Sequence, residues 1–242
     1  AMSQTEQLLR RMTGSITAYM DEVGRYPLHI SDYDKTVLAI RDGEFDAFKN
    51  LYPRVSDQTD DLLIEVAGRP GVVGGNMTLI LLAAVERFSP EAYLTACKRA
   101  VETGDSWRVQ TLVKESEGRL SEPLPSLHGE VILYAYTNNC RNIAKDLIAQ
   151  CTPEQIASVP PKLLRWVAEK LDFQTAVDLV DKGVRPGDEV VGILRTLTGQ
   201  HQEWMAERLL EHGMPVEPDN YDALYACVSN QAVGAAKLLL DR

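Results

Sequence analysis

Apolar residues recur every three or four positions along most of the chain, which is the spacing of one face of an amphipathic α-helix. Near the N-terminus, Leu8, Leu9, Met12 and Ile16 lie on one such stripe. Later segments repeat the pattern in pairs of short helices separated by a break. Because alternation with a period of two is rare, the pattern predicts an all-α protein.

The helical segments share a repeated block of six residues. Residues 47–52, 143–148, 175–180, 205–210 and 235–240 place their apolar side chains at the same spacing, and residues 108–113 follow it more loosely. Four residues before each block lies a break in the helical pattern. Two of these breaks are glycine and one is asparagine, the residues that most readily adopt a positive φ. These positions are Gly43, Gly104, Asn139, Leu171, His201 and Gln231.

A small or apolar residue precedes each break by four positions and should allow two helices to approach closely. These residues are Ala39, Ala100, Ala135, Val167, Leu197 and Cys227. A further unit fits between residues 59 and 82 if the glycine-rich stretch 68–75 is an elongated loop with its break near Val72. The breaks then recur every ~29 to ~35 residues, the period of stacked helix pairs. We therefore expect an α-solenoid of about seven units, comprising an N-terminal helix or cap in residues 1–30 and a repeat array in residues 31–242.

Several stretches resemble the ankyrin repeat. Residues 209–216 (LLEHGMPV) and 218–226 (PDNYDALYA) look like the end of an ankyrin helix, its finger and the next helix start. Residues 179–188 carry a similar finger, and residues 38–43 (LAIRDG) look like the family's Leu-Ala-Ala-x-x-Gly. Residues 60–82 are similar to divergent repeats of fungal ankyrin arrays. The resemblance implies a scaffold that binds proteins. Tetratricopeptide and HEAT solenoids are the alternative architectures, although their periods and longer helices fit less well.

Charge and composition argue against several classes of protein. The chain has 25 Lys and Arg against 35 Asp and Glu, a net charge of −10, whereas nucleic-acid binding requires a basic surface. The longest mostly apolar run, Met77 to Val85, is far shorter than the ~20 residues of a membrane span. No secretory leader is recognisable, and the four cysteines form no C-x-x-C pair. We therefore expect an intracellular protein of the cytoplasm or nucleus, bound to neither nucleic acid nor membrane.

Motifs for catalysis are lacking. The glycine-rich residues 68–75 have neither the Lys-Ser/Thr of a phosphate-binding loop nor a preceding strand. The four histidines show no zinc-binding spacing, and no nucleophile elbow is recognisable. We therefore predict a protein that is not an enzyme, with no catalytic residue, cofactor or metal.

The residues just before each break vary in type while the apolar columns stay constant, as expected of a recognition surface. Tyr134 and Trp166 share a column, five residues before the break, that Arg99 occupies in the preceding unit. This column could form the floor of a concave groove or could pack between repeats. The predicted partner-binding residues are Arg99, Glu102, Tyr134, Thr137, Asn138, Trp166, Glu169, Lys170, Gln200, Asp219, Tyr221 and Asp222.

An acidic stretch suggests the character of a partner. Residues 186–223 hold eight acidic and two basic side chains, a net charge of −6. This could be a solvated surface, or it could favour a basic peptide or protein. We expect a scaffold that binds a protein or peptide segment in its groove. The alternative is a targeting or regulatory arm of a larger enzyme or receptor, and we expect the native chain to continue beyond Arg242.

Overall fold

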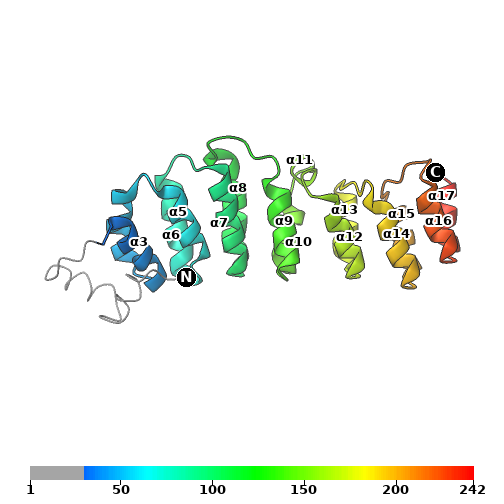
Figure 1. Cartoon of the computed structure of the whole chain (residues 1–242), viewed down its shortest axis with the longest axis horizontal. Helices are drawn as coiled ribbons and strands as arrows, with labels where there is room; N and C mark the ends of the chain where they lie inside the picture. Colours follow the sequence, from blue (N-terminus) through cyan, green and yellow to red (C-terminus); the bar gives the residue numbers. More distant parts are fainter. Residues whose placement is uncertain (1–29) are drawn as a thin grey trace. The chain divides into compact units, whose positions relative to one another are not determined.

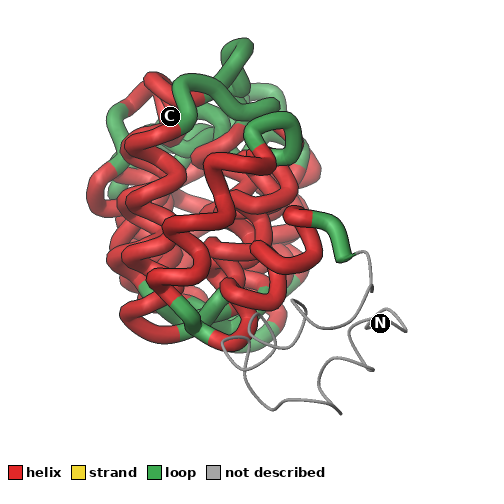
Figure 2. The backbone as a smooth tube through the Cα atoms, turned by 90° about the vertical axis from the view of Figure 1, so that its left-hand side faces the viewer, coloured by secondary structure: helices red, strands yellow, loops and turns green. Residues whose placement is uncertain are grey.

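The computed structural model describes residues 30–242, and their regular structure is entirely helical (Figure 2). Within this range no strand forms, and the one β-bridge joins Phe88 to Leu120 in parallel. The predicted all-α class is therefore confirmed. The helix predicted near Leu8 to Ile16 lies outside the described residues. The described chain divides into two compact units at the junction of Leu124 and Pro125.

The first unit contains three helix pairs, shown from blue to green in Figure 1. In each pair the two helices pack on each other, and the first helices α3, α5 and α7 also pack side by side. A short 3-10 helix, η1 (Tyr52–Val55), follows the first pair. The pairs are α3 (Asp32–Asp42) with α4 (Phe45–Leu51), α5 (Thr59–Gly68) with α6 (Gly71–Ala84), and α7 (Pro90–Glu102) with α8 (Ser106–Arg119).

The second unit contains four helix pairs and forms two layers (Figure 1). The first helices α12, α14 and α16 pack in sequence, as do the second helices α10, α13, α15 and α17. A single-turn helix, α11 (Pro153–Ile156), packs on α9. The pairs are α9 (Leu127–Thr137) with α10 (Arg141–Gln150), α12 (Pro161–Glu169) with α13 (Phe173–Asp181), α14 (Glu189–Gly199) with α15 (Glu203–Glu211), and α16 (Tyr221–Ser229) with α17 (Val233–Leu240).

The six breaks identified in the repeated sequence are confirmed in the backbone. Each break residue lies in the left-handed region, with φ between 55° and 74°. At Leu171 the break residue donates to the carbonyl of Ala168 at 2.9 Å, and Asp172 donates to that of Val167 at 3.1 Å. This pair of bonds is the Schellman closure, which satisfies carbonyls at the end of a helix. Each break therefore ends the first helix of a pair and turns the chain into the second.

The column of residues four positions before each break is buried throughout. Ala39, Ala100, Ala135, Val167, Leu197 and Cys227 each expose 0% of their surface. Backbones can approach closely there because the side chains are small or compact. The predicted column is therefore confirmed as part of the core.

The prediction of an elongated loop in the glycine-rich residues 68–75 is wrong. Only Arg69 and Pro70 connect α5 to α6, and the break is Gly71, with φ 82°, rather than Val72. Gly74 and Gly75 lie buried inside α6. A Cβ on Gly74 would come within 1.9 Å of the Arg69 carbonyl oxygen, so this glycine permits a close approach of backbones. With Gly71 as the break, Ala67 takes the small-residue position and is also 0% exposed.

Replacing Ala135 with leucine should destabilise the second unit by about 1–3 kcal/mol, because the larger side chain has no space in the buried column. The matched control is Ala149→Leu on the exposed face of α10, which should change stability by less than about 0.5 kcal/mol. Urea denaturation followed by far-ultraviolet circular dichroism measures both changes. Equal stability of the two variants would show that the column does not mediate close packing.

Candidate functional site

Most predicted partner-binding residues are accessible in the structure. Ten of the twelve are exposed, whereas the two aromatic residues Tyr134 and Trp166 are half-buried. Nine of the twelve belong to the last turns of the first helices or to the residues directly after them. The remaining three, Asp219, Tyr221 and Asp222, lie at the start of α16, the opposite end of a first helix. The predicted set is thus divided between two ends of the first-helix layer.

A pocket of about 480 Å³ opens at the ends of α3, α5 and α7 in the first unit. Arg41 lines it from α3, and Arg99 and Glu102 line it from α7. The turn after α5 adds Arg69 and Pro70. The structure therefore brings together two predicted partner-binding residues, Arg99 and Glu102, in a concave site with residues of two neighbouring pairs.

Two ion pairs hold most of the charge in this pocket. Arg41 Nη2 lies 3.4 Å from Glu65 Oε1, and Arg99 Nη1 lies 3.2 Å from Glu102 Oε2. Arg69 is different, because among the described residues it forms no ion pair. Its Nη1 donates to the carbonyl of Pro70 at 3.3 Å, and its Nε is buried without a hydrogen-bond partner. The pocket thus contains one guanidinium that no carboxylate neutralises.

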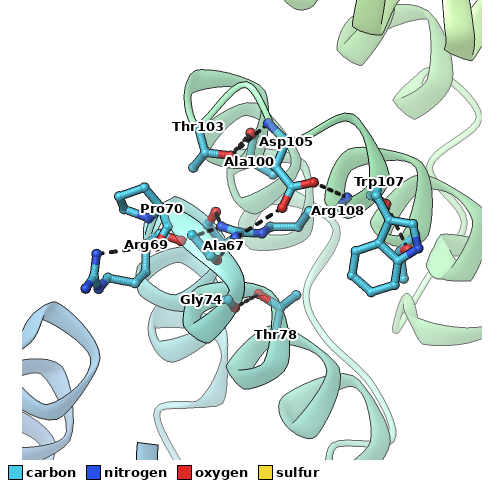
Figure 3. A network of polar contacts seen from close by, with 12 residues as sticks. Ala67, Arg69, Pro70, Gly74, Thr78, Ala100, Thr103, Asp105, Trp107 and Arg108 are labelled. Carbon is cyan, nitrogen blue, oxygen red and sulfur yellow. Dashed lines mark hydrogen bonds and ion pairs between the residues drawn. The ribbon is translucent and has the colours of Figure 1, made fainter. Parts of the chain in front are cut away.

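A buried arginine fixes the turn that carries Arg69 (Figure 3). The Arg108 side chain is 1% exposed and donates to three backbone carbonyls. Its Nη1 lies 2.9 Å from the Ala67 oxygen and 2.5 Å from the Arg69 oxygen, and its Nη2 lies 2.8 Å from the Gly71 oxygen. The bonds to Ala67 and Arg69 satisfy carbonyls at the end of α5, and the bond to Gly71 attaches the start of α6 to the same guanidinium. The floor of the pocket is therefore held by a hydrogen-bonded network.

The charge of Arg108 is balanced by Asp105 one helical turn away. Asp105 Oδ2 lies 3.3 Å from Arg108 Nη2, and Oδ1 accepts from the Arg108 backbone at 3.1 Å as the cap of α8. Burial lowers the pKa of the Arg108 guanidinium, and the neighbouring Asp105 opposes that shift. Figure 3 shows the Arg69 side chain turned away from Arg108. The two arginines therefore have separate roles, one in the turn and one in the pocket.

In the second unit, a smaller polar cluster joins the middle and end of α12 to the start of α14. Arg165 Nε donates to Glu169 at 2.9 Å, and its Nη1 donates to Glu189 of α14 at 3.0 Å. These interactions link α12 to α14, since Glu189 begins the next first helix. On α12, Lys162 Nζ lies 5.6 Å from the centre of the Trp166 ring. The half-buried Trp166 thus contacts a charged neighbour and retains an accessible portion.

Three further predicted residues contact their own unit. Thr137 Oγ1 donates to the Leu133 carbonyl at 2.9 Å, and Asn138 Nδ2 donates to the Tyr134 carbonyl at 2.8 Å. Lys170 Nζ lies 5.4 Å from the centre of the Tyr136 ring. Their polar groups close the ends of α9 and α12. These contacts give Thr137, Asn138 and Lys170 a structural role.

The acidic stretch from 186 to 223 is divided between different elements. Glu203, Glu207 and Glu211 lie along α15, a second helix, whereas Asp219 and Asp222 lie at the start of α16. Glu203 accepts a hydrogen bond from the Gly234 backbone at 2.9 Å. Burial, together with the neighbouring Glu203, raises the pKa of Glu207. Glu203 therefore links α15 to α17, whereas the negative charges of Glu203 and Glu207 repel each other, and neither residue lies at the first-helix ends.

Sequence reasoning missed Arg69, Glu65 and Arg165 as site residues. The signal for Arg69 was the dipeptide Pro70-Gly71, which marks a turn. Once Gly71 is taken as the break, Arg69 stands two residues before it, as Arg41 and Glu102 stand before theirs. The misplaced break near Val72 therefore concealed the central residue of the pocket.

Across residues 30–242, no group of three His, Cys, Asp or Glu side chains is arranged to hold a metal ion. No helix in that range combines the length and apolar character needed to cross a bilayer. Comparison of the chain with family models, curated proteins and solved structures finds no match.

Proposed function

We propose that this protein is an interaction scaffold whose helix pairs stack as an ankyrin-like solenoid and bind a protein or peptide segment. The binding surface is formed by the ends of the first helices. The seven helix pairs of residues 30–242, with their regularly placed left-handed breaks, support the repeat architecture. The finger-like turns after α13 and α15 support the ankyrin likeness, because Gly183 and Gly213 have φ of 95° and 89° there.

The observation that carries the proposal is the position of the pocket in the first unit. It lies where the first helices of three successive pairs end, and each pair contributes charged side chains to it. In a repeat protein whose apolar core is constant and whose first-helix ends vary, each repeat can offer a different side chain at the same place for recognition of a partner. This arrangement favours an extended partner segment that contacts several repeats.

The second unit provides the aromatic anchor of the proposal. Trp166 is half-buried near the end of α12, where a partner side chain could cover its remaining surface. Large aromatic residues at the centre of an interface often contribute most of the binding free energy. Asp219 and Asp222 are exposed at the start of α16, away from the surface at the first-helix ends, so they would attract a basic partner through long-range charge and not through contact.

A selection of random peptides displayed on phage, followed by binding kinetics, tests the proposal. We expect Trp166→Ala to raise the dissociation rate of a selected peptide by about tenfold or more. The matched control is Trp204→Ala on the second helix α15, where the side chain is 51% exposed, and this variant should bind like the wild type. Circular dichroism verifies that both variants fold.

Charge reversal at Asp219 and Asp222 addresses the basic character of the partner. We expect a lower association rate for a basic peptide, and the difference should shrink as the Debye length falls from about 10 Å at 0.1 M salt to about 3 Å at 1 M. If Trp166→Ala and the charge reversal both leave both rates unchanged while the fold is intact, the second unit does not bind the partner as proposed.

A further inference from the structure

We infer that the pocket at the ends of α3, α5 and α7 binds a carboxylate of the partner, with Arg69 as the residue that receives it. The inference rests on the proposed scaffold function and gives it a specific chemistry. It concerns the first unit alone. The partner group is an acidic side chain or a free C-terminus of an extended peptide.

Arg69 leaves most of its hydrogen-bond donors unused. A guanidinium has five N–H donors, and this one uses a single donor, for the Pro70 carbonyl at 3.3 Å. Its Nε is enclosed without an acceptor, so the side chain is partly desolvated in the absence of a partner. A partly desolvated guanidinium with unused donors gains more binding free energy from an anionic acceptor than a fully hydrated guanidinium does. The remaining donors on Nη1 and Nη2 are available for that acceptor.

The Arg69 head group is held between the end of α3 and the backbone after α5. A Cβ built on Gly43 would lie 2.9 Å from Arg69 Nη2, so the guanidinium packs against the left-handed glycine that ends α3. The backbone below it is fixed by the bonds from Arg108 to the carbonyls of Ala67 and Arg69. Arg69 is thus positioned from both sides before any ligand binds. Preorganisation of this kind reduces the entropy lost on binding.

The side chains that line the pocket carry a net positive charge. The pocket contains the cations Arg41, Arg69 and Arg99 and the carboxylates Glu65 and Glu102, a net charge of +1. Because two of the arginines pair with those carboxylates, one positive charge remains for a ligand. A single carboxylate balances this charge. A doubly charged phosphate would leave an excess of negative charge beside Glu65 and Glu102, which makes it the less suitable ligand.

Nuclear magnetic resonance of the arginine Nε–Hε groups in the full chain tests the inference. The probes are acetyl-Gly-Gly-Glu-Gly-Gly-amide, its Gln analogue, acetyl-pentaglycine with a free C-terminus, and inorganic phosphate. We expect the Glu peptide or the free C-terminus to shift the Arg69 signal in a saturable manner. The amide-only Gln analogue should bind at least about tenfold more weakly, because it lacks the charge that strengthens the hydrogen bonds. Comparison of the two carboxylate probes distinguishes a side chain from a chain end.

Two variants provide the control. Arg69→Gln should weaken carboxylate binding by about tenfold or more, whereas Arg54→Gln, at an exposed arginine of η1 outside the pocket, should leave it unchanged. If neither the Glu peptide nor the free C-terminus binds the wild type more tightly than the Gln peptide, the inference is overturned without any variant. A stronger response to phosphate than to either carboxylate would also overturn it. If selected peptides bind the first-helix ends but carboxylates do not, the carboxylate pocket fails and the scaffold function stands.

Discussion

Replacing Arg108 with methionine is expected to lower the free energy of unfolding by about 3–5 kcal/mol. The methionine has a similar length but cannot donate to the carbonyls of Ala67, Arg69 and Gly71. Each buried carbonyl left without a partner costs about 1–3 kcal/mol. Asp105 loses its ion-pair partner, although partial exposure of its side chain reduces that penalty. Chemical denaturation followed by circular dichroism measures the loss.

The controls for Arg108 separate charge from hydrogen-bond geometry. Arg195→Met removes an exposed arginine of α14 and should change stability by less than about 0.5 kcal/mol. Arg108→Lys retains the charge but presents a single ammonium in place of the planar fork, so an intermediate loss is expected. If Arg108→Met loses no more stability than Arg195→Met, the network does not support the end of α5.

The second large effect is expected for Gly129→Ala in α9. The added Cβ would lie 2.0 Å from the carbonyl oxygen of Ser158 and 2.7 Å from the backbone nitrogen of Val159. These atoms belong to the connection between α11 and α12, which must move to admit a methyl group. The movement would also disturb the hydrogen bond from the Gly129 N–H to Ser158 Oγ at 2.9 Å. We expect a loss of about 3 kcal/mol, the upper part of the range for overpacking.

Gly118→Ala in α8 is the matched control, since nothing lies within 4 Å of its added Cβ. Alanine is the better helix former, so this variant should gain about 0.5–1 kcal/mol. Thermal denaturation should show a lower melting temperature for Gly129→Ala than for the wild type and a higher one for Gly118→Ala. A Gly129→Ala protein as stable as the wild type would show that α9 and the following connection are not in close contact.

The sequence contained enough information to place the helix ends, including those that residue preference alone does not identify. Leu171, His201 and Gln231 adopt φ between 55° and 61°, although such residues rarely occupy the left-handed region. They were found because the repeated apolar blocks fix where each second helix must begin. Periodicity in the whole chain therefore outweighed local preference at these three positions.

The glycine-rich segment shows where local preference misled the prediction. Four glycines within eight residues usually indicate a loop. Here Gly74 is required inside a helix, because a Cβ on it would lie 1.9 Å from the carbonyl oxygen of Arg69 in the preceding turn. Tertiary packing of this kind has no signature in a single sequence.

The pocket was only partly predictable for a related reason. Arg99 and Glu102 follow from their positions before a break, but the role of Arg108 depends on distant backbone carbonyls. An arginine near the start of an amphipathic helix ordinarily indicates an exposed position. Its burial, and hence the fixed position of Arg69, becomes visible only when α5 and α8 are seen together.

The most direct test of the central claim is chemical-shift mapping of a selected peptide on the isotopically labelled full chain. We expect the largest amide shifts at the ends of the first helices, near Arg69 in the first unit and near Trp166 in the second. Residues on the outer second helices, such as Trp107 of α8 and Trp204 of α15, should shift little. Shifts confined to the second helices would contradict a partner-binding surface at the first-helix ends.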